Sequence, residues 1–309
     1  MSGIRVTPGL ITAQVTRDLR ASLEAMARQH RMISTGRRVN EPADDPGATA
    51  QALTVRSRQS ANAQFQRNVE TARRTLGAAD ATLRSLGDAL QQAKDLTVQG
   101  GNDSNDAAAR QAIGTQVDQI LEAVVAFANG RAADGTMLFG GQEVTVAPYA
   151  VTRDVNGRVT AVTASARGVD GARPVEVSEG LTVGQGVGGT SVFGATADAT
   201  NAFDTLIRVR DALTINDGAA VRAELDNLTI VQDRAMAASL VAGTRLGWLD
   251  ELENRLADES VTLSASLGTL EDADLAQAIT VLNELQLYHE AGLAAGARLL
   301  RQSLLDFLR

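Results

Sequence analysis

The stretch Ile33-Ser-Thr-Gly-Arg-Arg-Val-Asn-Glu-Pro-Ala-Asp-Asp-Pro46 separates two helix-like segments and ends in the pattern of a helix start. Gly36 is suited to close the first helix, because glycine adopts the left-handed conformation without a steric penalty from Cβ. Asp45 is placed as an N-cap whose carboxylate accepts from unpaired backbone amides, and Pro46 suits the first helical position, where no amide donor is needed. The stretch therefore predicts a helix end, a loop and a second helix start.

Downstream of this loop, apolar residues recur at helical spacing. From Val69 to Ala93 they follow one another by three and four residues, which is an a/d seam of more than three heptads. A second series runs from Ile113 to Phe127, after the polar turn residues 100–105. Because the connection is short, the two segments are predicted to form antiparallel neighbouring helices.

The middle of the chain differs in composition, since residues 140–195 are rich in glycine and alternate β-branched with polar residues. Asn156-Gly157 lies between two such runs, 151–155 and 159–163, and predicts a β-hairpin. Asp170-Gly171 predicts another turn, before a short strand at 175–177. Phosphate binding is not expected at the glycine-rich residues 184–189, because the wider context of a nucleotide-binding loop is missing.

A further helical block is predicted after residues 216–218, and it extends past Trp248, a packing residue, to Leu270. The predicted fold class is mainly α with a β-rich insert. Its N- and C-terminal segments form a long antiparallel helical bundle or coiled coil, and a small β domain occupies the middle. The expected segments are an N-terminal helix and loop (1–46), a helical hairpin (47–139), a β-rich outer domain (140–200), returning helices (201–272) and a C-terminal helix (273–309).

Both chain ends carry apolar stripes at helical spacing that lack a partner within their own segment. Each buried Leu or Ile contributes on the order of 1.5–3 kcal/mol, so leaving both stripes in water would forfeit ~15 kcal/mol or more. We therefore expect the ends to pair with each other and then with neighbouring subunits, although pairing within one monomer as an ordinary bundle remains an alternative. The stripes include Leu19, Leu23 and Met26 near the N-terminus and Leu275, Ile279, Leu282, Leu293, Leu300 and Leu304 near the C-terminus.

Composition argues against several classes of function. The formal net charge is -8 and no basic stripe is present, which disfavours a nucleic-acid partner. The chain has no cysteine, which excludes disulfides, thiolate metal sites and cysteine nucleophiles. We expect no cleavable signal peptide, because polar residues interrupt the first sixteen positions, and no membrane-spanning helix.

Catalytic and metal-binding patterns are also lacking, so we expect neither an enzyme nor a cofactor or metal. The two histidines, His30 and His289, fall in the two terminal segments, and no carboxylate follows His30 at a spacing suited to shared metal ligation. Asp44 and Asp45 do not form a calcium loop, because the alternating oxygen ligands and the closing Glu are missing. Arg37 and Arg38 remain candidates for a subunit contact.

Four motifs resemble the hook-associated protein 3 family, the flagellin-related proteins of the junction between flagellar hook and filament. The motif that carries most weight is the opening loop, through Ser34, Thr35, Gly36, Arg38, Pro42, Asp44, Asp45 and Pro46. The other motifs are residues 137–149, residues 179–183 with 192–194, and residues 272–279 with 299–308. Together they cover roughly two thirds of the chain, and residues 150–178 match nothing firmly.

The resemblance implies a flagellin-like fold and a structural protein that polymerises between hook and filament. It further implies export through the flagellar type III apparatus, and thus an extracellular location. The implied partners are further copies of the chain, other hook-associated proteins, hook protein, flagellin and a cytosolic export chaperone. The implied assembly residues are Leu19, Leu23, Met26, Arg37, Arg38, Asp44, Asp45, Leu275, Ile279, Leu282, Leu293, Leu300 and Leu304.

Alternatives to the junction protein are a flagellin and, from another class, a cytoplasmic coiled-coil scaffold. The scaffold predicts a stable soluble oligomer without a β insert. An enzyme hidden in the β region has no residue set in its favour.

Overall fold

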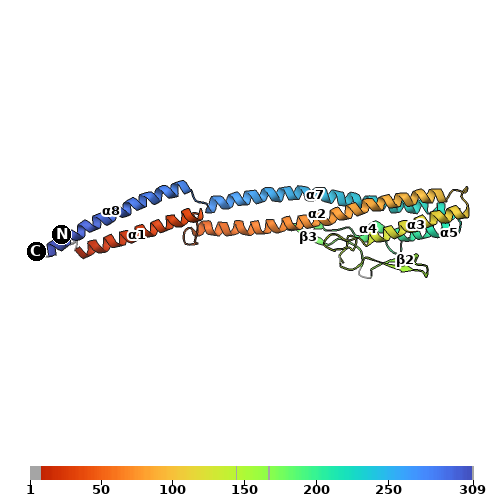
Figure 1. Cartoon of the computed structure of the whole chain (residues 1–309), viewed down its shortest axis with the longest axis horizontal. Coiled ribbons are helices and arrows are strands. Elements are labelled where there is room, and N and C mark those ends of the chain that lie inside the picture. The colour runs from red at the N-terminus through yellow and green to blue at the C-terminus, as the bar shows by residue number, and fades with distance from the viewer. Residues whose placement is uncertain (1–7, 144, 166–167, 308–309) are drawn as a thin grey trace. The chain divides into compact units, whose positions relative to one another are not determined.

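The computed structural model describes residues 8–143, 145–165 and 168–307. These residues are mainly helical and fall into two compact units (Figure 1). The central unit comprises Asn62–Asp258, and the terminal unit combines the two ends of the chain, up to Ala61 and from Glu259 onward. The predicted fold class, mainly α with a β-rich insert, is confirmed.

The central unit is organised by helix α2 (Pro46–Gly100), whose second half carries the predicted heptad seam. Every seam residue from Val69 to Ala93 is at most 1% exposed, so the periodicity identified the buried face correctly. Helix α3 (Ala107–Ala128) runs back beside α2, as the short polar connection predicts. Asp106 caps α3 by accepting from the backbone amide of Ala109 at 2.7 Å.

The returning segment expected at 201–272 contains one more helix than the apolar stripe after residues 216–218 indicated. Helix α5 (Ala202–Thr214) precedes residues 216–218, and helices α6 (Gly218–Ala223) and α7 (Leu225–Glu271) follow them. Asn201 starts α5, because its side-chain oxygen accepts from the amides of Phe203 and Asp204 while its amide group donates to Gly194 O. The sequence analysis missed α5 and also the short helix α4 (Gly189–Phe193).

The β-rich insert consists of two antiparallel hairpins. Strands β1 (Tyr149–Arg153) and β2 (Val159–Ala164) form the hairpin predicted from Asn156-Gly157. Strand β1 nevertheless ends at Arg153 rather than at residue 155, because the Asp154 carboxylate accepts from the amides of Asn156 and Arg158 and closes a longer loop. Strands β3 (Pro174–Ser178) and β4 (Leu181–Gly184) form the second hairpin.

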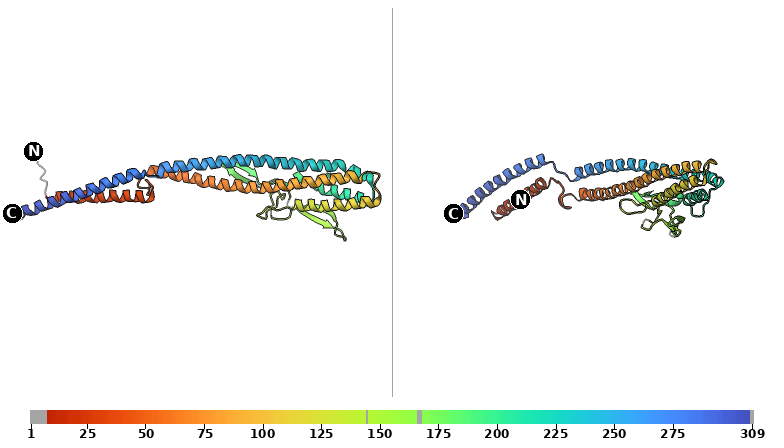
Figure 2. Two further views of the ribbon diagram at one scale, coloured as in Figure 1. Left: turned by 45° about the horizontal axis from the view of Figure 1, so that its top comes forward. Right: turned by 45° about the vertical axis from the view of Figure 1, so that its right-hand side comes forward.

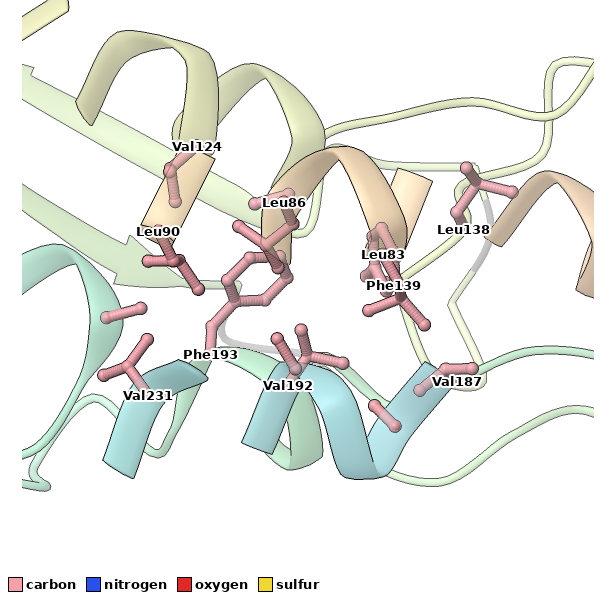
Figure 3. Packing of buried hydrophobic residues seen from close by; sticks show 14 of the residues in the cluster. Leu83, Leu86, Leu90, Val124, Leu138, Phe139, Val187, Val192, Phe193 and Val231 are labelled. Carbon is pink, nitrogen blue, oxygen red and sulfur yellow. The ribbon is translucent and has the colours of Figure 1, made fainter. Parts of the chain in front are cut away.

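An aromatic cluster joins this insert to the helices of the central unit. Phe139, Phe193 and Phe203 are fully buried, and Tyr149 is 3% exposed. The rings of Phe139 and Phe193 meet edge to face with centroids 5.5 Å apart, while Phe193 and Phe203 stack at 5.2 Å. Figure 3 shows Phe193 directed from α4 toward Leu86 on α2. The insert therefore shares one hydrophobic core with the helices.

The glycine-rich segment after β4 is explained by close packing against this cluster. A Cβ atom on Gly189 would lie 2.4 Å from the Tyr149 hydroxyl oxygen and 2.8 Å from the Phe139 carbonyl oxygen. Only a residue without a side chain fits at this position. The glycine therefore serves the packing of the core.

Candidate assembly interface

The loop predicted from residues 33–46 has the expected geometry in the terminal unit. Helix α1 (Pro8–Thr35) ends at Gly36, which has φ 71° and donates its amide to Met32 O at 2.9 Å. At the other end, the Asp45 carboxylate accepts from the Ala48 amide at 2.9 Å and caps the first turn of α2. Both ends of the loop are therefore fixed by local backbone chemistry.

The two acids of the loop have separate roles. Asp44 accepts from the backbone amides of Glu41 and Asn40 at 3.0 and 3.1 Å, and these bonds, that of Glu41 first, lower its pKa. Donation by the Ala48 amide and then by the Arg38 guanidinium lowers the pKa of Asp45. A carboxyl group whose pKa is lowered by folding stabilises the fold at pH values above the pKa of an unfolded aspartate. This contribution is lost as the pH falls through the lower pKa of the folded state.

The same loop is bonded to the connection between α7 and helix α8 (Leu275–Phe307). The Arg38 amide donates to Glu271 O at 2.6 Å, and the Ala273 amide donates to Gly36 O at 2.9 Å. Arg38 also reaches across with its guanidinium, which donates to Leu270 O at 2.9 Å. The breaks between α1 and α2 and between α7 and α8 are therefore held together as one joint.

A buried acid completes this joint. Glu271 is 5% exposed, and its carboxylate lies 2.7 Å from the Arg56 guanidinium and 3.8 Å from that of Arg37. A buried carboxylate of this kind needs such partners, because an unpaired one would be strongly destabilising. Sequence reasoning missed Glu271 and Arg56, since their pairing joins residues far apart in the chain.

Replacing Asp45 with alanine should therefore loosen the start of α2. We expect amide hydrogen exchange at Ala48 to become several-fold faster, because the capping acceptor is lost. Asp45→Ser should keep most of the protection, since a hydroxyl oxygen also caps, although it cannot pair with Arg38. Glu41→Ala is the matched control, because Glu41 contributes its backbone amide to the loop. Unchanged exchange at Ala48 in the alanine variant would contradict the capping role.

The terminal helices α1 and α8 pair along most of their described length (Figure 2). Gly292 and Gly296 allow a close approach, since added Cβ atoms would lie 3.4 Å from Leu19 Cδ2 and 3.0 Å from Val15 Cγ1. Ala278 and Leu282 are also buried, at 3% and 8% exposure. The Gly-x-x-x-Gly spacing was a readable signal for this contact, and sequence reasoning did not use it.

The contact between α1 and α8 leaves two buried polar atoms without a hydrogen bond within the described part of the chain. Ser22 Oγ and His289 Nδ1 are buried and have no hydrogen-bond partner among the residues that the structure describes. Both residues line a groove of about 300 Å³ between α1 and α8. Buried polar atoms are nearly always paired, but the Tyr149 hydroxyl in the central core also lacks a partner among the described residues, so this feature is not confined to the α1–α8 contact.

Several apolar candidates remain at the surface of this pair. Leu23 is 51% exposed, Leu275 45%, Ile279 48% and Leu293 49%. Leu19 and Met26 are half-buried. Among the described side chains of the predicted C-terminal stripe, Leu282 is buried. Leu300 and Leu304 belong to α8, but their side chains lie outside the described part of the chain. The α8 contact therefore uses a face beside the one that the leucine spacing indicated.

Nothing in the described ranges resembles a catalytic or metal centre. No group of three or more His, Asp or Glu side chains among these residues could hold a metal ion. Nor is any described helix long and apolar enough to cross a membrane.

Comparison with known proteins identifies one matching family model and relatives among the flagellar hook-associated proteins 3. The family described as bacterial flagellin N-terminal helical region matches residues 10–143. Flagellar hook-associated protein 3 of Salmonella typhimurium is 26% identical over 241 residues, which cover 77% of this chain and 70% of the relative. Flagellar hook-associated protein 3 of Escherichia coli is 24% identical over 238 residues, with the same two coverages.

Solved structures share the fold at lower identity. The crystal structure of FlgL from Xanthomonas campestris has a TM-score of 0.58 and 16% identity, covering 68% of this chain and 98% of that one. The flagellar junction protein FlgL from Legionella pneumophila has a TM-score of 0.56 and 14% identity, covering 72% and 100%. The resemblance to flagellar hook-associated protein 3 that the opening loop predicted is therefore confirmed, and it extends over 77% of the chain.

Proposed function

We propose that the protein is a structural subunit of the bacterial flagellum that polymerises at the junction between hook and filament. The similarity to two flagellar hook-associated proteins 3 over 77% of the chain is the observation that carries the proposal. A structural role also fits the expectation that the chain is not an enzyme. It acts outside the cell as part of the flagellum, after export from the cytoplasm.

The polymerisation elements of this proposal are residues 1–46 and 273–309, which both belong to the terminal unit. Support comes from the exposed apolar side chains of Leu23, Leu275, Ile279 and Leu293. Exposed apolar side chains such as these are suited to contact with another protein. Neighbouring copies, hook protein, other hook-associated proteins and flagellin are the partners in the assembled state.

Before export, a cytosolic chaperone is the partner that would cover the exposed face of α8. The supporting observation is again the exposed Leu275, Ile279 and Leu293, which would otherwise promote premature association. The remaining segments, 47–139, 140–200 and 201–272, supply a helical hairpin, an outer β-rich domain and returning helices. The loop between α1 and α2 contains four further candidate residues, Arg37, Arg38, Asp44 and Asp45.

Two alternatives make different predictions about location. A flagellin would lie along the whole filament, and a coiled-coil scaffold would stay inside the cell. The scaffold also predicted a chain without a β insert, whereas four strands are present. Flagellin remains the nearer rival, because the family match over residues 10–143 is to the flagellin N-terminal region.

Labelling through a single introduced cysteine tests the location. The natural chain contains no cysteine, and Val155 at the tip of the first hairpin is fully exposed. We expect a Val155→Cys variant, labelled with a fluorescent maleimide on intact cells of the source bacterium, to give one spot where hook meets filament. Cells with the natural chain are the control for background. Label along the filament, or none outside the cell, would contradict the proposal.

A further inference from the structure

Two helix faces of the central unit are exposed and carry no charge, although 21% of all residues are charged. On α7, the exposed positions between residues 235 and 249 form the first of these, which we name the α7 face. Met236 is 58% exposed, Leu240 72%, Val241 46% and Trp248 36%. The complete α7 face is Met236, Ala237, Leu240, Val241, Gly243, Thr244, Gly247 and Trp248.

The second uncharged surface, the α3 face, is made of small and amide side chains. Its members are exposed over three turns of α3, and they are Ala108, Gln111, Ala112, Thr115, Gln116 and Gln119. The charged residues of α3 are occupied within the chain: Arg110 donates to Gly100 O, Asp118 accepts from Arg210, and Glu122 pairs with Arg153. The six residues of the α3 face are therefore uncharged, and the exposed Glu122–Arg153 pair lies beyond their C-terminal end.

Glycines add a second feature to the α7 face. Gly243 and Gly247 lie in the interior of a long helix, where glycine costs roughly 1 kcal/mol relative to alanine. A Cβ atom on either would have no atom of the described chain within 4 Å. No packing within this chain explains these glycines, and their bare backbone would let another helix approach closely.

The α7 face also borders a groove. A volume of about 800 Å³ lies between α7 and α2, with Met236, Leu240 and Gly243 on one side and Gly87 on the other. Its charged lining residues come from α2, where Arg84 pairs with Asp80 at 2.6 Å. An exposed apolar ridge next to such a groove is typical of a protein–protein interface, because the core of such an interface contains few charged residues.

We propose that the α7 face of one copy packs against the α3 face of a neighbouring copy. A partner that covers the α7 face must itself be uncharged, since desolvating an unpaired charge there would be costly. The chain supplies such a partner in its own α3 face. The two faces lie on different helices and share no residue, so each copy offers two distinct surfaces.

This geometry gives a heterologous contact, in which each copy uses one face toward each neighbour. Contacts of that type propagate into rings or helical polymers, whereas a face that binds its own copy stops at a dimer. The inference therefore rests on the proposed function, which requires polymerisation, and assigns the lateral contact to named residues of the central unit.

Opposite charges placed on the two faces test the inference. Assembly of the full chain, promoted with ammonium sulfate, is followed by sedimentation and by Trp248, the sole tryptophan, whose emission should shift to shorter wavelength on burial. We expect Leu240→Glu and Ala112→Arg each to raise the concentration needed for assembly by about tenfold or more. The chain with both substitutions should recover much of the loss, because the introduced carboxylate of one copy would meet the introduced guanidinium of the next.

Controls and outcomes separate this inference from the proposed function. Asn254→Glu adds the same charge to an exposed position of α7 outside the face, and it should leave assembly unchanged. If the natural chain assembles and Leu240→Glu assembles equally well, the assignment of the lateral contact is wrong and the proposed function stands. Failure of the double variant to recover, with recovery in a mixture of Leu240→Glu and Leu240→Arg chains, would show a contact of α7 with α7. A natural chain that never assembles would contradict both.

Discussion

Replacing Phe193 with alanine is expected to lower the free energy of unfolding of the central unit by about 3–5 kcal/mol. Phe193 is fully buried, and its ring lies within 5.5 Å, centroid to centroid, of the rings of Phe139, Tyr149 and Phe203. Truncation removes these contacts and leaves a cavity where α4, α2 and the insert meet. Urea unfolding followed by Trp248 fluorescence measures the loss.

The size of the substitution can be varied as an internal control. Phe193→Leu keeps most of the buried volume, so it should cost clearly less than the alanine variant. Val155→Ala, at the fully exposed hairpin tip, should leave the unfolding free energy nearly unchanged. Equal stability of Phe193→Ala and the natural chain would mean that the aromatic cluster does not join the insert to the helices.

The buried helical seam was predictable because its cause is local. Residues 69–93 of α2 repeat every three or four positions, and the helix period alone places them on one face. The aromatic cluster was not predictable in this way. Phe139, Phe193 and Phe203 come from separate elements, and only the folded chain brings them together.

The loop that opens α2 was also predictable, since Gly36 and Asp45 act on neighbouring backbone groups. Its bonds to the α7–α8 connection were not, because they join distant residues such as Arg38 and Leu270, which are 232 positions apart. On α8, leucine spacing identified a helix but not the face that contacts α1. The close approach at Gly292 and Gly296 decided that face and left Leu275 and Leu293 exposed.

Loss of the buried arginine at position 210 should have a second large effect. The Arg210 side chain is 6% exposed and connects three elements, because it bonds Asp118 on α3 at 2.8 Å and Val159 O on β2 at 2.6 Å from its own helix α5. Arg210→Met removes both bonds and leaves a half-buried carboxylate uncompensated. We expect a loss of about 3 kcal/mol or more in urea unfolding.

A second ion pair that involves α3 serves as a control, because it is exposed where the Arg210 pair is buried. Arg153 binds Glu122 one turn further along α3, with side-chain exposures of 43% and 39%. Arg153→Met should cost much less than Arg210→Met, since exposed pairs are screened by water. Adding Asp118→Asn to Arg210→Met should recover part of the loss, because the orphaned charge is removed while its shape is kept. Equal losses of unfolding free energy in Arg210→Met and Arg153→Met would contradict this expectation. They would mean that removing the buried arginine between α3, α5 and β2 destabilises the fold no more than removing an exposed one.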